Sequence, residues 1–92
     1  MNQDSASVIA IEAIVFIVTD ETLCSRFMTL TGSDEDAIRA GINDTDFQAA
    51  ALDFLLANEP DLITFCEANH IDPTAPLTAK HVLAGPNSWQ SI

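Results

Sequence analysis

The sequence predicts an all-α protein: a compact bundle of five or six short helices in a single domain that spans residues 1–92. No segment of useful length alternates apolar and polar residues with the period of two that a strand requires. Apolar residues instead recur three and four positions apart, between aspartate, glycine and proline residues that mark helix ends. A chain of 92 residues is long enough to bury one small core.

One helical unit is predicted to occur twice, 38 positions apart. Residues 12–34 align with residues 50–72 without a gap. The identical positions are apolar anchors and helix starts: Ala13 and Ala51, Phe16 and Phe54, Glu21 and Glu59, Phe27 and Phe65, and Asp34 and Asp72. A single unit cannot bury both of its apolar stripes, so we expect the two helical hairpins to pack together through their phenylalanines.

The first predicted helix spans residues 6–18 and begins at one of the serines at positions 5 and 7. The second spans residues 21–30. Asp20 caps its start, and Gly32 ends it by adopting the left-handed conformation that suits glycine. These two helices form the hairpin of the first unit.

The third predicted helix is short, residues 35–40, because Ser33 or Asp34 caps it and Gly41 ends it. The fourth spans residues 46–57. One apolar stripe runs along the fourth helix at helical spacing and consists of Phe47, Ala51, Phe54 and Leu55. This stripe is expected to face the core.

The fifth predicted helix spans residues 60–69 and places Pro60 in its first turn, where a missing N–H is harmless. Its stripe consists of Leu62, Phe65, Cys66 and Asn69. The sixth helix follows Asp72-Pro73, keeps Pro76 in its first turn and ends at Gly85-Pro86.

The tail, residues 85–92, contains the only tryptophan, Trp89. Three interpretations remain open for it. The tail folds back so that Trp89 seals one end of the core, it frays as many termini do, or it offers an aromatic anchor to a partner.

The first predicted helix differs from its counterpart in the second unit. Val8 and Val15 stand where the second unit has Asp46 and Asp53. The first helix therefore carries a second apolar stripe, which consists of Val8, Ile11, Val15 and Val18. Two explanations compete: the helix is the buried centre of the bundle, or the stripe is the contact surface of a homodimer.

The chain is strongly acidic, with a net charge of -11 and only three basic residues, Arg26, Arg39 and Lys80. Ten of its 14 acids lie at predicted helix starts, where carboxylates accept free backbone N–H groups. The charge repels phosphate backbones and anionic membranes, so we expect neither direct nucleic-acid binding nor membrane binding. It favours a basic protein partner, although solubility or adaptation to salt is the simpler explanation of the charge.

Two cysteines are too few for a disulfide framework and fit a reducing compartment. The first residues, Met1-Asn2-Gln3-Asp4, lack the basic region of a secretory signal. The apolar run at residues 8–18 contains Glu12 and is shorter than the ~20 residues that a membrane span needs. These features predict a cytoplasmic protein.

No metal, cofactor or catalytic site is predicted. Cys66 and His70 are four positions apart, and His81 and Cys24 could join them, but paired close spacings typical of zinc sites are lacking. The aspartate clusters around residues 34–46 do not match an EF-hand loop. Both cysteines lie on predicted core faces, where thiols tend to be inert.

Some of these residues also resemble a known family. They are the stretch from Ile11 to Phe27, Leu30-Thr31-Gly32 followed by an acidic cap, and Asp53-Phe54-Leu55-Leu56 followed by Glu59. Together they resemble a family of small helical proteins, mostly from alphaproteobacteria, that is catalogued only as a domain of unknown function. The resemblance covers roughly residues 9–75. It implies a cytosolic all-helical domain and brings no catalytic residues.

The sequence thus predicts a non-enzymatic protein-interaction module whose partner is a second copy or a basic protein. The alternative is an acidic mimic of nucleic acid, or an inhibitor of a DNA-binding protein, which would occupy a basic groove. A mimic should spread its acids over one face, whereas here they gather at helix starts.

Overall fold

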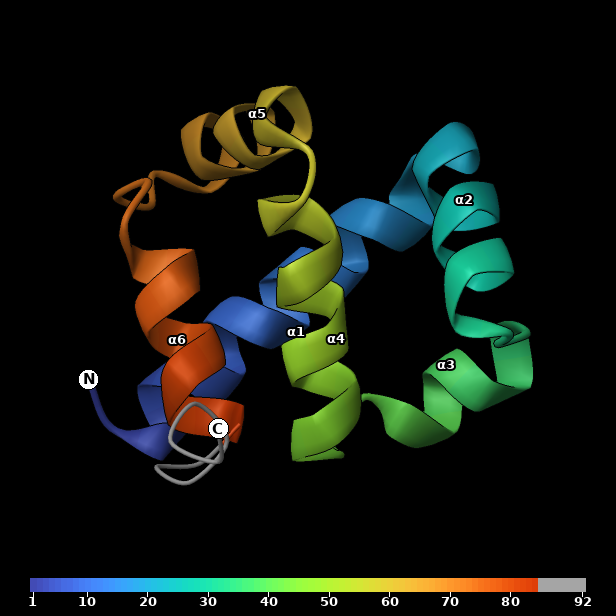
Figure 1. The fold of residues 1–92 in the computed structure, drawn as a ribbon, viewed down its shortest axis with the longest axis horizontal. Coiled ribbons are helices and arrows are strands. Elements are labelled where there is room, and N and C mark those ends of the chain that lie inside the picture. Colours follow the sequence, from blue (N-terminus) through green and yellow to red (C-terminus); the bar gives the residue numbers. More distant parts are fainter. Residues whose placement is uncertain (85–92) are drawn as a thin grey trace, which may run out of the picture.

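The computed structural model describes residues 1–84. Within this range the chain forms helices and no strand, which confirms the predicted all-α class (Figure 1). The helices are α1 (Gln3–Thr19), α2 (Glu21–Thr31), α3 (Glu35–Gly41), α4 (Thr45–Leu56), α5 (Glu59–Asn69) and α6 (Ala75–Ala84).

Three helices, α1, α4 and α6, contact one another and form the centre of the bundle. The helices approach closely because the facing residues are small and fully buried: Ala6, Ala10 and Ala13 on α1, Ala51 on α4 and Ala79 on α6. Helix α2 packs on α1, and α5 packs on α4 and α1. The short α3 lies at the edge of the molecule between α2 and α4 (Figure 1).

Phenylalanines join the two halves of the chain. The Phe27 ring contacts the rings of Phe47 and Phe54 edge-on, at centroid distances of 5.6 and 5.3 Å. Phe16 contacts Phe65 in the same manner at 5.5 Å. Phe27 and Phe65 are fully buried, whereas Phe16 is only half-buried and lies at the rim of the core.

Aspartates cap the starts of α2, α3 and α4; the cap at Asp20 was predicted, and Asp34 was one of two candidates. Asp20, Asp34 and Asp44 each accept a backbone N–H of the helix that follows. The predicted start of α1 was wrong: Asn2, not a serine, caps it by accepting the N–H of Ser5, so the helix begins earlier. A short polar side chain one turn upstream serves this purpose as well as a hydroxyl does.

Gly41 ends α3, as predicted, and has a second role in packing. It is the last residue of α3, and its φ is not positive. A Cβ at this position would come within 2.7 Å of the Phe47 ring. Gly41 is therefore needed for the close packing of α3 on the start of α4.

The boundaries of α2 and α5 agree with the 38-residue spacing. Both helices have 11 residues, and their first and last residues lie 38 positions apart. Each ends at a left-handed residue, Gly32 with a φ of 68° and His70 with a φ of 54°. The duplication itself stays a prediction.

Gln48 is the buried polar residue that the sequence did not reveal; only 2% of it is exposed. Its amide nitrogen donates to the carbonyl of Ile42 at 2.7 Å. Its amide oxygen accepts the hydroxyl of Ser7 at 3.1 Å. Gln48 thereby joins α1, α4 and the loop that follows α3.

Candidate interaction surface

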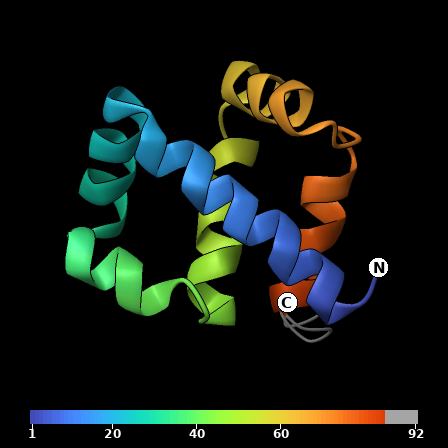
Figure 2. The ribbon, with the colours of Figure 1, turned by 180° about the vertical axis from the view of Figure 1, so that it is seen from behind.

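Within residues 1–84, helix α1 is central but covered on one side only. It contacts α2, α4, α5 and α6 through a buried face that includes Ile14 and Ile17. Seen from the opposite side in Figure 2, α1 crosses the molecule with no helix in front of it. The expectation that α1 is buried all round is therefore wrong, because the other helices pack against a single face.

The predicted second stripe lies on the uncovered side. Val8 is 55% exposed, Val15 49% and Val18 40%, and Ile11 is half-buried. We call these four residues the α1 ridge. Removing apolar side chains from water lowers the free energy, so an exposed row of valine and isoleucine side chains on one helix is a candidate contact surface.

A hollow lies on each side of the ridge. The α3-side hollow, of about 290 Å³, is enclosed by α1, α2 and α3. Its apolar lining consists of Ile14, Val15, Val18, Ile38 and Ile42, together with Cys24. The α5-side hollow, of about 310 Å³, lies between α1 and α5 and includes Ile11, Glu12, Val15 and Phe16. Val15 borders both hollows, which makes it the centre of the surface.

The α3-side hollow is lined by a basic residue that has no ion-pair partner among residues 1–84. Arg39 and Glu35 stand at this hollow on α3. Arg39 is exposed and forms no ion pair with any of residues 1–84. Arg26 lies 3.5 Å from Asp61, and Lys80 lies 2.7 Å from Asp53. Arg39 is thus the cation that the described part of the chain leaves available.

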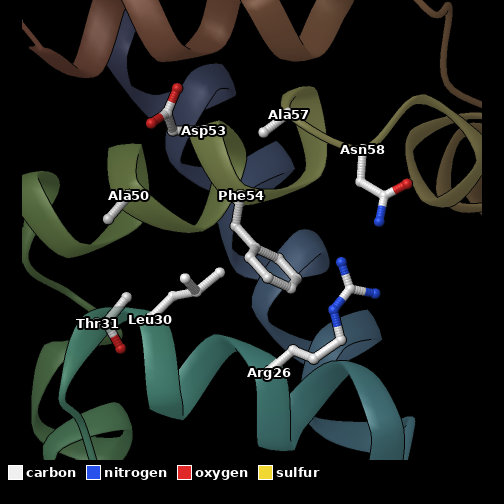
Figure 3. Close-up of a pocket in the computed structure, with 8 residues that line it drawn as sticks. All are labelled: Arg26, Leu30, Thr31, Ala50, Asp53, Phe54, Ala57 and Asn58. Atoms are coloured by element: carbon white, nitrogen blue, oxygen red, sulfur yellow. The ribbon is translucent and has the colours of Figure 1, made fainter.

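A separate groove of about 320 Å³ lies between α2 and α4 (Figure 3). In it the Arg26 guanidinium lies 5.6 Å from the centre of the Phe54 ring, with the Asn58 side chain beside it (Figure 3). Leu30 is 73% exposed at the same groove. Because Phe54 and Asp61 already engage Arg26, the groove offers a partner less charge than its lining suggests.

The two thiols have unequal surroundings. Cys66 is buried as predicted; burial raises the pKa of its thiol, and the negative charge of Asp72 raises it further. Cys24 was predicted to lie on a core face, but it is half-buried and lines the α3-side hollow. It follows that any reactive thiol of this pair is Cys24.

The predicted metal-spacing residues do not assemble. Within residues 1–84 no three histidine, cysteine or acidic side chains are arranged to hold an ion. His70 ends α5 in the left-handed conformation, in the place that Gly32 occupies at the end of α2. Its sequence position therefore reflects a helix end.

Sequence reasoning missed the hollow on the α3 side. Ile38 and Ile42 are four positions apart and line it together, and that spacing was a usable signal. The position of α3 relative to α1 was not encoded in any local pattern. Trp89, the remaining candidate contact residue, lies outside the described residues.

One structural observation and three comparisons with known proteins complete the description of the chain. Within residues 1–84, no helix combines the length and apolar character needed to cross a bilayer. Neither the curated proteins nor the solved structures contain a match to the chain. The model of one family, described as Protein of unknown function (DUF3572), matches residues 3–86 and so covers every helix of the fold. The chain therefore belongs to the DUF3572 family.

Proposed function

We propose that this protein is a non-enzymatic protein-interaction module that binds a protein partner at the α1 ridge. The observation that carries the proposal is the exposure of Val8, Val15 and Val18 on one side of a helix whose other side is fully packed. Covering the exposed halves of three valines contributes roughly 2–4 kcal/mol, which is a useful share of a binding free energy.

The surroundings of the ridge support binding of a folded protein surface. The face is hollowed on both sides of Val15, by about 290 Å³ on the α3 side and by about 310 Å³ on the α5 side. Shaped apolar surfaces with a polar rim are typical of protein interfaces. The partner is a second copy of the chain or a basic protein, because the net charge of -11 repels nucleic acid and anionic lipid.

The buried Cys66 thiol supports a role without catalysis. The pKa of Cys66 is raised by burial, which disfavours the nucleophilic thiolate. No cofactor enters the proposal. The small number of cysteines and the family resemblance support a cytoplasmic location, and the family resemblance supports an alphaproteobacterial origin.

The alternative, an acidic mimic of nucleic acid, draws its support from the net charge of -11. Three of the acids, Asp20, Asp34 and Asp44, already serve as helix caps. Their positions therefore follow from folding, and a mimic is not needed to explain them.

The test compares two charge-matched variants. Val15→Asp places a carboxylate at the centre of the ridge, and Leu30→Asp places one at the exposed end of α2, away from the ridge. Each immobilised variant is exposed to a lysate of its source cells and to a differently tagged copy of the wild-type chain. We expect a stoichiometric protein partner on wild type and Leu30→Asp that is lost from Val15→Asp.

Two results would speak against the proposal. In the first, no protein is retained in a Val15-dependent manner. In the second, a basic DNA-binding protein is retained equally by all three baits and is released by added DNA. The second result would support the nucleic-acid mimic.

A further inference from the structure

The α1 ridge and the α3-side hollow lie side by side at the same level of the molecule. Val15 and Val18 belong to the ridge and also form one wall of the hollow. The opposite wall is formed by Ile38 and Ile42. The face therefore carries a row of exposed apolar side chains and, beside Val15 and Val18, a recess with a largely apolar lining.

Such a face is complementary to itself. A twofold axis that runs parallel to α1, between the ridge and the hollow, places the ridge of each copy over the hollow of the other. Residues at equal height then meet, so Val15 and Val18 reach the partner's hollow without a shift along the helix. We propose that the protein partner at the α1 ridge is a second copy of this chain, bound in this twofold arrangement; the proposal rests on the proposed function.

The charges on the face fit the same arrangement. Arg39 lies beyond the hollow, on α3, and Glu12 lies on the other side of the ridge, in the α5-side hollow. The twofold rotation exchanges these two flanks, so Arg39 of each copy faces the flank of the other copy that carries Glu12. Glu35, one turn before Arg39 on α3, is carried to the same flank, so the pairing that we propose is specifically between Glu12 and Arg39, which has no ion pair among residues 1–84.

The outline of the molecule sets an upper limit on the contact face. Figure 2 views the molecule along its shortest axis with α1 in front, and the two longer extents are 33 and 27 Å. Because the ridge and the α3-side hollow occupy only part of this outline, we expect an interface no larger than the ~800 Å² per partner of the standard size. Because each chain carries a charge of -11, repulsion between copies weakens the dimer at low salt.

The test measures self-association of the full chain by sedimentation velocity and light scattering over a wide concentration range. We expect a dimer that strengthens, or stays constant, when salt is added. Val15→Asp should weaken self-association by at least about tenfold, because it buries an unpaired carboxylate. The charge-matched control Leu30→Asp should dimerise as the wild type does. Circular dichroism checks that each variant stays folded.

Charge reversal separates the proposed contact from general repulsion. Glu12→Arg makes the net charge less negative than -11, and Arg39→Glu makes it more negative. General repulsion alone would strengthen the first variant and weaken the second. The proposed pairing instead predicts that both weaken by about three- to fivefold and that the double variant, with the charges exchanged, recovers the wild-type value.

The outcomes distinguish this inference from the proposed function. A wild-type chain that stays monomeric at all concentrations, while Val15-dependent capture of another protein persists, overturns the second copy and leaves the interaction module standing. A monomer without any Val15-dependent partner overturns both. A dimer that is insensitive to Val15→Asp and to both charge reversals shows a different interface and overturns the arrangement.

Discussion

When α1 and α4 are aligned at the predicted offset of 38 positions, their inner faces are both apolar and buried, whereas their outer faces differ in polarity. Ala13 and Ala51 are both fully buried, and so are Ile17 and Leu55. On the outer faces, Val15 of α1 corresponds to Asp53 of α4, whose side chain is 63% exposed and whose carboxylate forms an ion pair with Lys80. The packing of such a helix thus accepts a charged residue at this position, so folding alone does not explain the valines of α1.

The second helices of the two halves, α2 and α5, also differ at their starts and their ends. Helix α2 starts at a working cap and ends at glycine, whereas α5 starts at Asn58 without a capping bond and ends at His70. The second half therefore has a helix start and a helix end that are less well stabilised than their counterparts in the first half. Four predictions compare the two halves.

The largest effect is expected at the paired phenylalanines. Phe27→Ala and Phe65→Ala should each lower the free energy of unfolding by about 3–5 kcal/mol, because both rings are fully buried and leave a cavity. Phe16→Ala should cost less than Phe54→Ala, since Phe16 lies at the rim of the core. Urea unfolding followed by circular dichroism measures all four. A wild-type midpoint for Phe65→Ala would refute a core shared by both halves.

The helix ends should respond in opposite directions. Gly32→Ala forces a side chain into a φ of 68° and should cost about 1–2 kcal/mol, although no atom crowds the site. His70→Gly relieves the same strain and should stabilise the protein by up to about 1 kcal/mol, after the greater flexibility of the unfolded chain is counted. Thermal unfolding at neutral pH provides the comparison, and a destabilised His70→Gly would contradict it.

The helix starts should respond unequally. Asp20→Ala removes the acceptor of the Leu23 N–H and should cost about 1 kcal/mol. Asn58→Ala removes no capping bond and should stay within about 0.5 kcal/mol of the wild type. Equal losses in urea unfolding would show that the Asn58 side chain contributes in another way.

The two cysteines should differ in thiol reactivity, and this is the prediction with the smallest effect on stability. At mildly alkaline pH, Cys24 should react with a disulfide reagent before Cys66, because burial and Asp72 raise the Cys66 pKa. The raised pKa also makes stability depend on pH. Because deprotonation of Cys66 is harder in the folded state, the free energy of unfolding falls as the pH rises through the titration of Cys66. Cys66→Ser and Cys24→Ser identify each reaction. Equal rates in native protein would contradict the assigned burial.

The sequence was a good guide where a local pattern carried the signal. Caps and glycines placed the helices to within a few residues, and the stripe of α5 put Phe65 and Cys66 in the core. Local patterns failed where residues of different helices meet. Gln48 and Gly41 owe their roles to Ser7 and Phe47, and neither partner is implied by helical spacing.

By itself, the sequence determined the all-α class, the helix ends and the presence of two apolar stripes on the first helix, because these depend on contacts within a few residues. Tertiary packing decided which stripe is covered. Alanines on one face of α1 let α4 and α6 approach closely, and this left Val8, Val15 and Val18 on the uncovered side. Periodicity shows that a helix has an apolar face, but only the arrangement of neighbouring helices fixes which face lies against the core.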